Sequence, residues 1–193
     1  MNWIREFCGE PGCDSAREWL AAWRVENPTG TPEQALSACE SREWRIWVAN
    51  RLREDSPALA EMARDADPEV RLVVVWRLPE ASPALAEMAR DADPEVRQVV
   101  AQRLPEDSPV LALLAREEDW EVRREVAHRL REESTVLAGM AGDVDPRVRC
   151  EVVRRLPEGS PLLAGLAGDE DPEVRWMVTQ RLPEGSPLLA GLA

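Results

Sequence analysis

Apolar residues follow a helical spacing along most of the chain, and Asp67 begins one clear example. From there the apolar side chains fall at Val70, Val74, Val75 and Leu78. These positions share one face of an α-helix. Asp67 is a good N-cap, Pro68 suits the first helical position, and Pro79 prevents the helix from continuing. The segment therefore predicts a helix of about three turns with one buried side.

A second, shorter helix follows each of these longer ones. In the same unit Ser82 is its predicted N-cap, Pro83 opens it, and Leu85 faces inward. Six of the nine serines hold this capping position: Ser56, Ser82, Ser108, Ser134, Ser160 and Ser186. We therefore interpret these serines as structural and not as nucleophiles. Glycine inside several of the short elements weakens an α-helix, which favours a tight, partly 3₁₀ segment.

The helix pair repeats every 26 residues. Five full units run over residues 45–70, 71–96, 97–122, 123–148 and 149–174, and a sixth starts at Arg175. One unit cannot bury its own apolar face, whereas stacked units share a continuous core. The sequence thus predicts an all-α solenoid over 45–193. Residues 1–44 break the period and form an irregular cap with a degenerate repeat.

The unit DADPEVRLVVVWRLPEASPALAEMAR resembles the leucine-rich repeat variant family. It is similar, more distantly, to HEAT-like repeats, which share its Asp-x-Asp-Pro-x-Val-Arg turn. The resemblance covers 45–193 and implies a right-handed α-solenoid, in which each unit pairs an α-helix with a short α or 3₁₀ helix. Such families mostly serve as interaction scaffolds, so the resemblance implies a fold more than an activity.

Three cysteines, Cys8, Cys13 and Cys39, fall in the cap. Some members of the resembled family carry an amino-terminal iron–sulfur cluster, which implies these thiols as candidate ligands for iron–sulfur or zinc. A four-iron cluster needs four ligands. Cys150 cannot be the fourth, because it lies about four repeats, or ~40 Å, along the stack. We favour ordinary thiols and no cofactor, with the metal centre as the alternative.

The charge of the chain limits its partners. The formal net charge is -13, with 37 acidic and 24 basic side chains. Nucleic acid and anionic membranes need clustered positive charge, so a basic protein is the better partner. No apolar run reaches the ~18 residues that span a bilayer, and no signal peptide is visible. We expect a cytoplasmic protein, with self-association through its carboxyl end as a further expectation.

Arginines recur in two ladders at the repeat period. The first comprises Arg45, Arg71, Arg97, Arg123, Arg149 and Arg175. The second comprises Arg51, Arg77, Arg103, Arg129, Arg155 and Arg181. A phosphate or RNA track is one interpretation. We favour pairing of the first ladder with the acidic turns, at Asp67, Asp93, Asp119, Asp145 and Asp171, because bidentate Arg–carboxylate bonds suit such a turn.

Few residues suggest catalysis. His128 is the single histidine, and Cys150 in the neighbouring repeat is the nearest candidate for a Cys–His pair. Such a nucleophile also needs an oxyanion site and a cleft, so a surface histidine is favoured. Glu125 and Glu151 occupy one column of adjacent repeats and are expected on a solvated face. The chain is therefore predicted not to be an enzyme.

The predicted binding surface is the outward face of the first helices in the early repeats. The columns one, two and five residues after each first-ladder arginine point away from the core and vary between repeats. The candidate residues are Ile46, Trp47, Leu72, Val73, Trp76 and Val99. An apolar surface with two tryptophans is typical of an interface. The alternative is that residues 1–30 cover it and make Trp47 and Trp76 part of the core. The sequence predicts a non-enzymatic binding or scaffolding module, and an iron–sulfur metalloprotein is the rival.

Overall fold

The structure is a computed structural model that divides into two compact units, Met1–Met88 and Ala89–Ala193. It describes residues 18, 21–23, 25–30, 34–35, 38–183 and 186. Among these residues the only regular elements are helices, which confirms the all-α prediction. No helix in the described part of the chain has both the length and the apolar character needed to cross a membrane.

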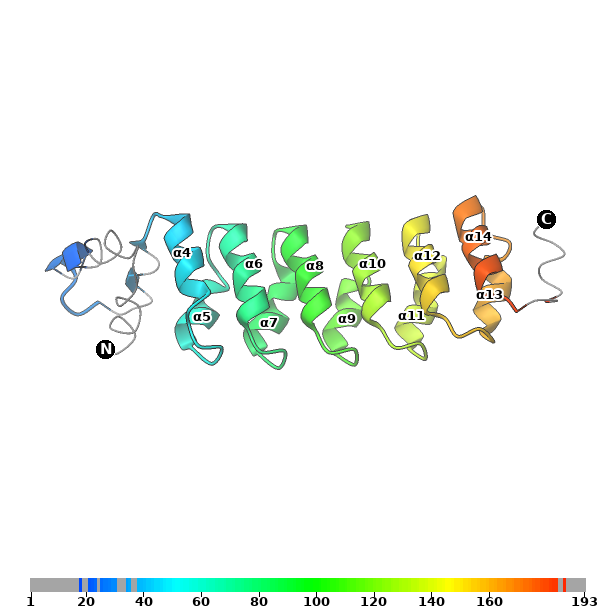
Figure 1. Ribbon diagram of the computed structural model, residues 1–193, viewed down its shortest axis with the longest axis horizontal. Helices are drawn as coiled ribbons and strands as arrows, with labels where there is room; N and C mark the ends of the chain where they lie inside the picture. The colour runs from blue at the N-terminus through cyan, green and yellow to red at the C-terminus, as the bar shows by residue number, and fades with distance from the viewer. Residues whose placement is uncertain are drawn as a thin grey trace. The chain divides into compact units, whose positions relative to one another are not determined.

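In the first unit, the helices alternate between longer and shorter elements. They are α4 (Arg42–Ala49), α5 (Pro57–Met62), α6 (Pro68–Arg77) and α7 (Pro83–Glu87). Figure 1 shows α4 and α6 side by side, and they are in direct contact. Before them, residues 27–30 form a turn, in which the Gly30 amide donates to the Asn27 carbonyl. A Cβ on Gly30 would meet the Trp23 ring, so a larger residue there would displace that ring.

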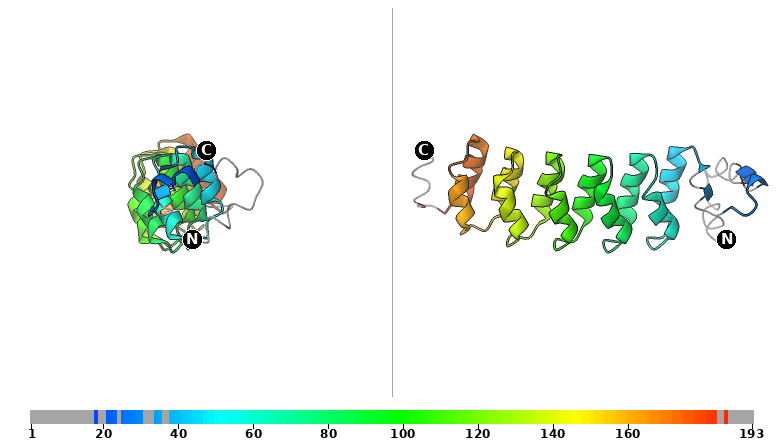
Figure 2. Two further views of the ribbon diagram at one scale, coloured as in Figure 1. Left: turned by 90° about the vertical axis from the view of Figure 1, so that its left-hand side faces the viewer. Right: turned by 180° about the vertical axis from the view of Figure 1, so that it is seen from behind.

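The second unit continues the same alternation. Its elements are α8 (Pro94–Arg103), α9 (Pro109–Leu114), α10 (Trp120–Arg129), α11 (Thr135–Gly139), η2 (Met140–Gly142), α12 (Pro146–Arg155), α13 (Pro161–Leu166) and α14 (Pro172–Arg181). A further 3₁₀ turn, η1, spans Met88–Arg90. Helices α8, α10, α12 and α14 form one row, each touching the next, and α9, α11 and α13 form a second row (Figures 1 and 2). This stack of two-helix repeats is the architecture of an α-solenoid.

The helix ends follow the predicted capping chemistry. Asp67 accepts a hydrogen bond from the Glu69 amide at 2.9 Å, and Pro68 occupies the first turn of α6. Leu78 is extended, as the residue before Pro79 should be. The serines precede the shorter helices, but their hydroxyls are used unevenly: Ser108 caps α9, whereas Ser82 makes no side-chain capping bond at α7.

The core lies between the two rows of helices. The predicted positions Val70, Val74 and Val75 are fully buried, and so are their counterparts in α8, Val96 and Val100. Each shorter helix adds a buried leucine at the same position of the repeat, from the facing side. These leucines are Leu59, Leu85, Leu111, Leu137 and Leu163. Burial of the same columns in every repeat confirms the core predicted from helical periodicity.

Candidate functional site

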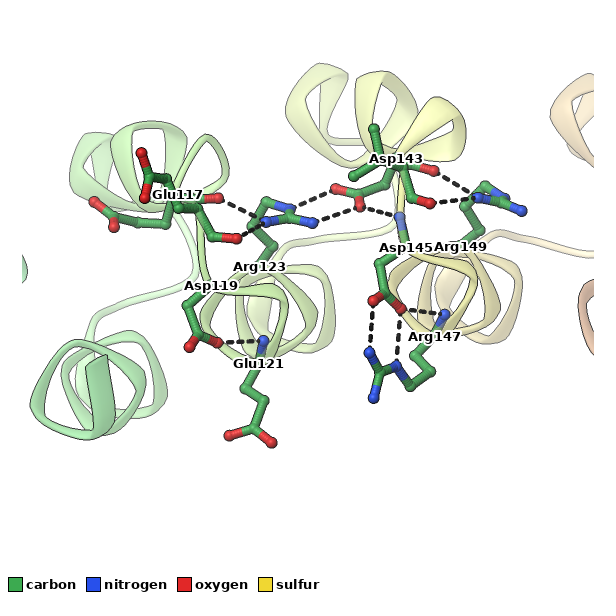
Figure 3. Close-up of polar contacts among 10 residues, drawn as sticks. Glu117, Asp119, Glu121, Arg123, Asp143, Asp145, Arg147 and Arg149 are labelled. Atoms are coloured by element: carbon green, nitrogen blue, oxygen red, sulfur yellow. Dashed lines mark hydrogen bonds and ion pairs between the residues drawn. The ribbon is translucent and has the colours of Figure 1, made fainter.

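The first arginine ladder crosslinks consecutive repeats. In the second unit, Arg123 donates from Nη1 to the carbonyl oxygens of Glu117 and Glu118, both at 2.7 Å. Its Nε and Nη2 reach the carboxylate of Asp143, in the next turn, at 2.8 and 2.9 Å (Figure 3). Arg149 repeats this arrangement with Asp169. Each guanidinium therefore binds the turn before its own helix and the turn of the following repeat.

The partner carboxylates differ from those predicted. The ladder pairs with the acidic residue two positions before each expected aspartate, so Asp143 replaces Asp145 as the partner of Arg123. Asp145 instead accepts from the Arg147 amide at 2.9 Å and caps α12. Asp145 is further engaged by the guanidinium of Arg147, which donates to both of its carboxylate oxygens. The prediction that the ladder is structural is confirmed, but the pairing named for it is wrong.

The second ladder binds the other end of the longer helices. Arg77 donates from Nη2 to the Leu52 carbonyl at 2.8 Å in the first unit. In the second unit Arg155 reaches the Leu130 carbonyl at 3.0 Å, and Arg181 reaches that of Leu156 at 2.7 Å. The last carbonyls of a helix have no hydrogen-bond donor within it and carry partial negative charge. A guanidinium there donates the missing hydrogen bond and places positive charge at the negative end of the helix. Neither ladder therefore forms a track of free cations.

The predicted binding residues of the first unit lie on α4 and α6. Ile46, Trp47, Leu72 and Val73 are half-buried, and Trp76 is 54% exposed. The Arg51 guanidinium lies over the Trp47 ring, 4.0 Å from its centroid. We call Ile46, Trp47, Leu72, Val73 and Trp76 the apolar surface. The alternative, in which residues 1–30 cover this surface, rests mostly on residues outside those described and stays open.

Val99, the sixth predicted binding residue, is half-buried on α8 in the second unit. Further along that unit, the positions one, two and five residues after each first-ladder arginine are mostly polar. They border a cleft of about 450 Å³. We call this the charged cleft. Its lining residues are Arg124, Glu125, His128, Arg147, Cys150, Glu151, Arg154 and Glu173. They come from α10, α12 and α14, so three consecutive repeats build the site.

Glu151 is a buried residue of the charged cleft. Its side chain is only 6% exposed, which corrects the expectation that it faces solvent. His128 Nδ1 lies 3.0 Å from its Oε1, and the Arg154 guanidinium donates to its Oε2. A carboxylate accepts hydrogen bonds only, so Nδ1 of His128 carries a proton. His128 is thus fixed by a residue of the next repeat and is not an isolated surface histidine.

Cys150 and His128 line the same cleft but do not form an activated pair. Burial of Cys150, together with the nearby negative charge of Glu173, raises the pKa of its thiol to about 11. A thiol with that pKa is protonated at neutral pH and is a poor nucleophile. His128 directs Nδ1 to Glu151. The geometry gives no support to a Cys–His nucleophile.

The cysteines of the cap are described only in part. Cys39 is buried, its thiol donates to the Ser41 carbonyl, and burial raises the pKa of that thiol. Cys8 and Cys13 lie outside the described residues. Within the part of the chain that the structure describes, no cluster of three or more His, Cys, Asp or Glu could hold a metal ion. The iron–sulfur or zinc centre stays a prediction, which the colour and metal content of the purified protein would check.

Comparisons with known proteins identify the architecture. No protein-family model matches the sequence, and no curated protein matches it. A solved structure, described as a leucine-rich repeat variant with a novel repetitive structural motif, is similar at 40% identity and a TM-score of 0.66. The match covers 79% of this chain and 62% of that one, so the chain spans less than two thirds of its length. An engineered protein is similar at 17% identity and a TM-score of 0.44, over 89% of this chain and 91% of the other. The first match and the repeat geometry agree that this chain is a helical repeat protein similar to a leucine-rich repeat variant.

Proposed function

We propose that the chain is a non-enzymatic protein-binding module whose apolar surface is its contact site. The observation that carries the proposal is the contrast between a uniform scaffold and a variable face. The ladders make the same bonds from repeat to repeat, for instance at Arg123 and Arg149. The outward columns instead change from apolar on α4 and α6 to charged on α10 and α12. Such a division is typical of a scaffold that specialises its surface.

The composition of the apolar surface supports protein binding. It places two tryptophans and three aliphatic side chains on adjacent helices, with Trp76 more than half exposed. Exposed apolar patches commonly mark interaction sites, and tryptophan is enriched among residues that dominate binding energy. The net charge of -13 favours a partner with basic residues around its own apolar anchor. A cytoplasmic location and self-association through the carboxyl end remain predictions; the latter falls largely on residues outside those described.

The test compares tryptophan substitutions at two places. Trp76→Ser, and the double variant with Trp47→Ser, should weaken capture of a partner identified from native cytoplasm while the melting temperature holds. Trp176→Ser is the matched control, because Trp176 on α14 is 59% exposed and lies outside the apolar surface. Equal loss of partner binding in Trp176→Ser would contradict the assignment of the apolar surface as the contact site. Loss only together with unfolding would show that the surface is core.

A further inference from the structure

Glu151 occupies a column that holds a glutamate in α10, at Glu125, and apolar residues in other repeats. The equivalent position is Val99 in α8 and Met177 in α14. Burying a carboxylate is unfavourable even when it is paired, and apolar replacements at such sites are often neutral or stabilising. A buried charge where valine also fits is therefore a cost to stability. Residues that oppose stability in this way tend to serve a function.

The bonds of Glu151 indicate what that function is. Its two carboxylate oxygens are used by His128 and Arg154, whose side chains are 61% and 59% exposed. A side chain that is hidden from solvent thus holds two polar groups in place at the surface. The adjoining repeats are themselves held rigid by the bidentate Arg123 and Arg149 pairs. Preorganised donors on rigid elements are the arrangement that binding sites need.

The charge around the cleft is unusual for this chain. Helices α10 and α12 contain seven arginines, although the chain as a whole is acidic. Four belong to the ladders, and Arg147 is paired with Asp145 (Figure 3). Arg147 also stacks on the Trp120 ring. Arg124 has no carboxylate partner among the described residues; its guanidinium lies 5.4 Å from the Trp120 ring centroid. Arg124 therefore lines the cleft beside Arg154 with its guanidinium outside any ion pair of the described residues, and the carboxylates of Glu125 and Glu173 line the same cleft.

We propose that the charged cleft binds an anionic side chain, a carboxylate or a phosphate, within a basic peptide segment of a protein partner. Arg124 and Arg154 contact the anion, and Glu151 is a positioning residue that orients Arg154 and His128. Glu125 and Glu173, which also line the cleft, select basic residues on either side of the anion. This rests on the proposed function, since both require a protein partner, but it uses a different set of helices.

Defined peptides test the site on the full chain. The probes are Arg-Ala-Glu-Ala-Arg, the same peptide with phosphoserine at the centre, and the same peptide with alanine there. Because the chain has one histidine, the imidazole NMR signals of His128 report binding at the cleft without overlap. Either anionic peptide, or both, should shift these signals and bind about tenfold or more tighter than the alanine peptide, since each charge-assisted hydrogen bond is worth one to two decades. Which of them binds identifies the source of the anion.

Matched variants distinguish recognition of the anion in the cleft from an effect of the protein's net charge. Arg124→Gln with Arg154→Gln should remove the preference for the anionic peptide. Arg116→Gln with Arg131→Gln changes the charge equally at two exposed arginines outside the cleft and should keep it. Equal binding of all peptides, no shift at His128, or equal loss in the control would overturn the proposal. Peptide binding that survives Trp47→Ser with Trp76→Ser would show that the cleft acts apart from the apolar surface.

Glu151→Val tests the positioning role. The variant should fold with an unchanged or higher melting temperature, and the nitrogen shifts of the His128 imidazole should change as its bond to the carboxylate is lost. Anionic peptides should bind more weakly, although the substitution removes a negative charge from the site. Tighter anion binding would show that Glu151 acts only through its charge, and a collapse of stability would show that it is structural; either result overturns the positioning role.

Discussion

Arg149 donates two hydrogen bonds to the carboxylate of Asp169, from Nε at 2.8 Å and from Nη2 at 2.7 Å. The two side chains are 7% and 8% exposed, so the pair is sheltered from water. The same guanidinium also reaches the Asp143 carbonyl at 2.7 Å. A single side chain therefore connects two consecutive turns, and this connection is the basis of the first predictions.

Arg149→Ala should lower the free energy of unfolding by about 3 kcal/mol, because it leaves a buried carboxylate without its partner. Arg97→Ala should cost less, about 1 kcal/mol, since its partner Glu117 is 26% exposed and the single contact is 3.1 Å long. Urea denaturation of both variants measures the difference. Arg116→Ala, at an exposed position, is the control and should be neutral. Equal losses at Arg97 and Arg149 would contradict the role assigned to the buried carboxylate.

Acid should weaken this pair selectively. Burial raises the pKa of Asp169, but hydrogen bonds from Arg149 and the Asp171 amide, with the nearby positive charge, outweigh it and lower the pKa below its ordinary 3.8. A depressed folded-state pKa gives stability that is present above the unfolded value and lost as pH falls through the folded one. Melting temperature should therefore decline below about pH 4. The decline in melting temperature with falling pH should be shallower in Arg149→Ala. Parallel curves for this variant and the unmodified chain would contradict the role of Arg149 in lowering the pKa of Asp169.

The second ladder makes a weaker and simpler contact. Arg155→Ala removes one bond to the Leu130 carbonyl and should cost about 1 kcal/mol. Arg155→Lys should recover part of this, because a carbonyl needs only one donor. Arg149→Lys should recover little, because lysine cannot make the bidentate bond to a carboxylate. Chemical denaturation of the two lysine variants distinguishes the ladders, and similar recovery in both would argue against the distinction.

The buried thiols should resist modification. With Cys8 and Cys13 changed to serine, Cys39 and Cys150 remain, and burial raises the pKa of both thiols. A disulfide reagent should therefore react slowly with the native chain at mildly alkaline pH and rapidly in denaturant. The number of thiols released over time measures this. Rapid reaction at Cys150 in the native chain would mean that the charged cleft opens readily to solvent.

The repeat, the helix ends and the core were predictable from the sequence because they depend on local interactions. An aspartate followed by proline caps and opens a helix within three residues, as at Asp67 and Pro68. Helical periodicity likewise places Val70 and Val74 on one face whatever lies beyond them. The aspartate recurs in each full repeat and the proline in all but one, where Trp120 replaces it, so the order of the amino acids alone reveals the 26-residue spacing.

Contacts between repeats were decided only by the tertiary structure. Arg123 pairs with Asp143 and not with Asp145, two positions later, which caps α12 instead. Glu151 lies on a nominally outward column, yet neighbouring residues of the cleft cover it. Burial there depends on long side chains that meet across adjacent repeats, 23 residues apart in the case of His128 and Glu151. A helical wheel describes one helix at a time, so it cannot show what the next repeat places above it.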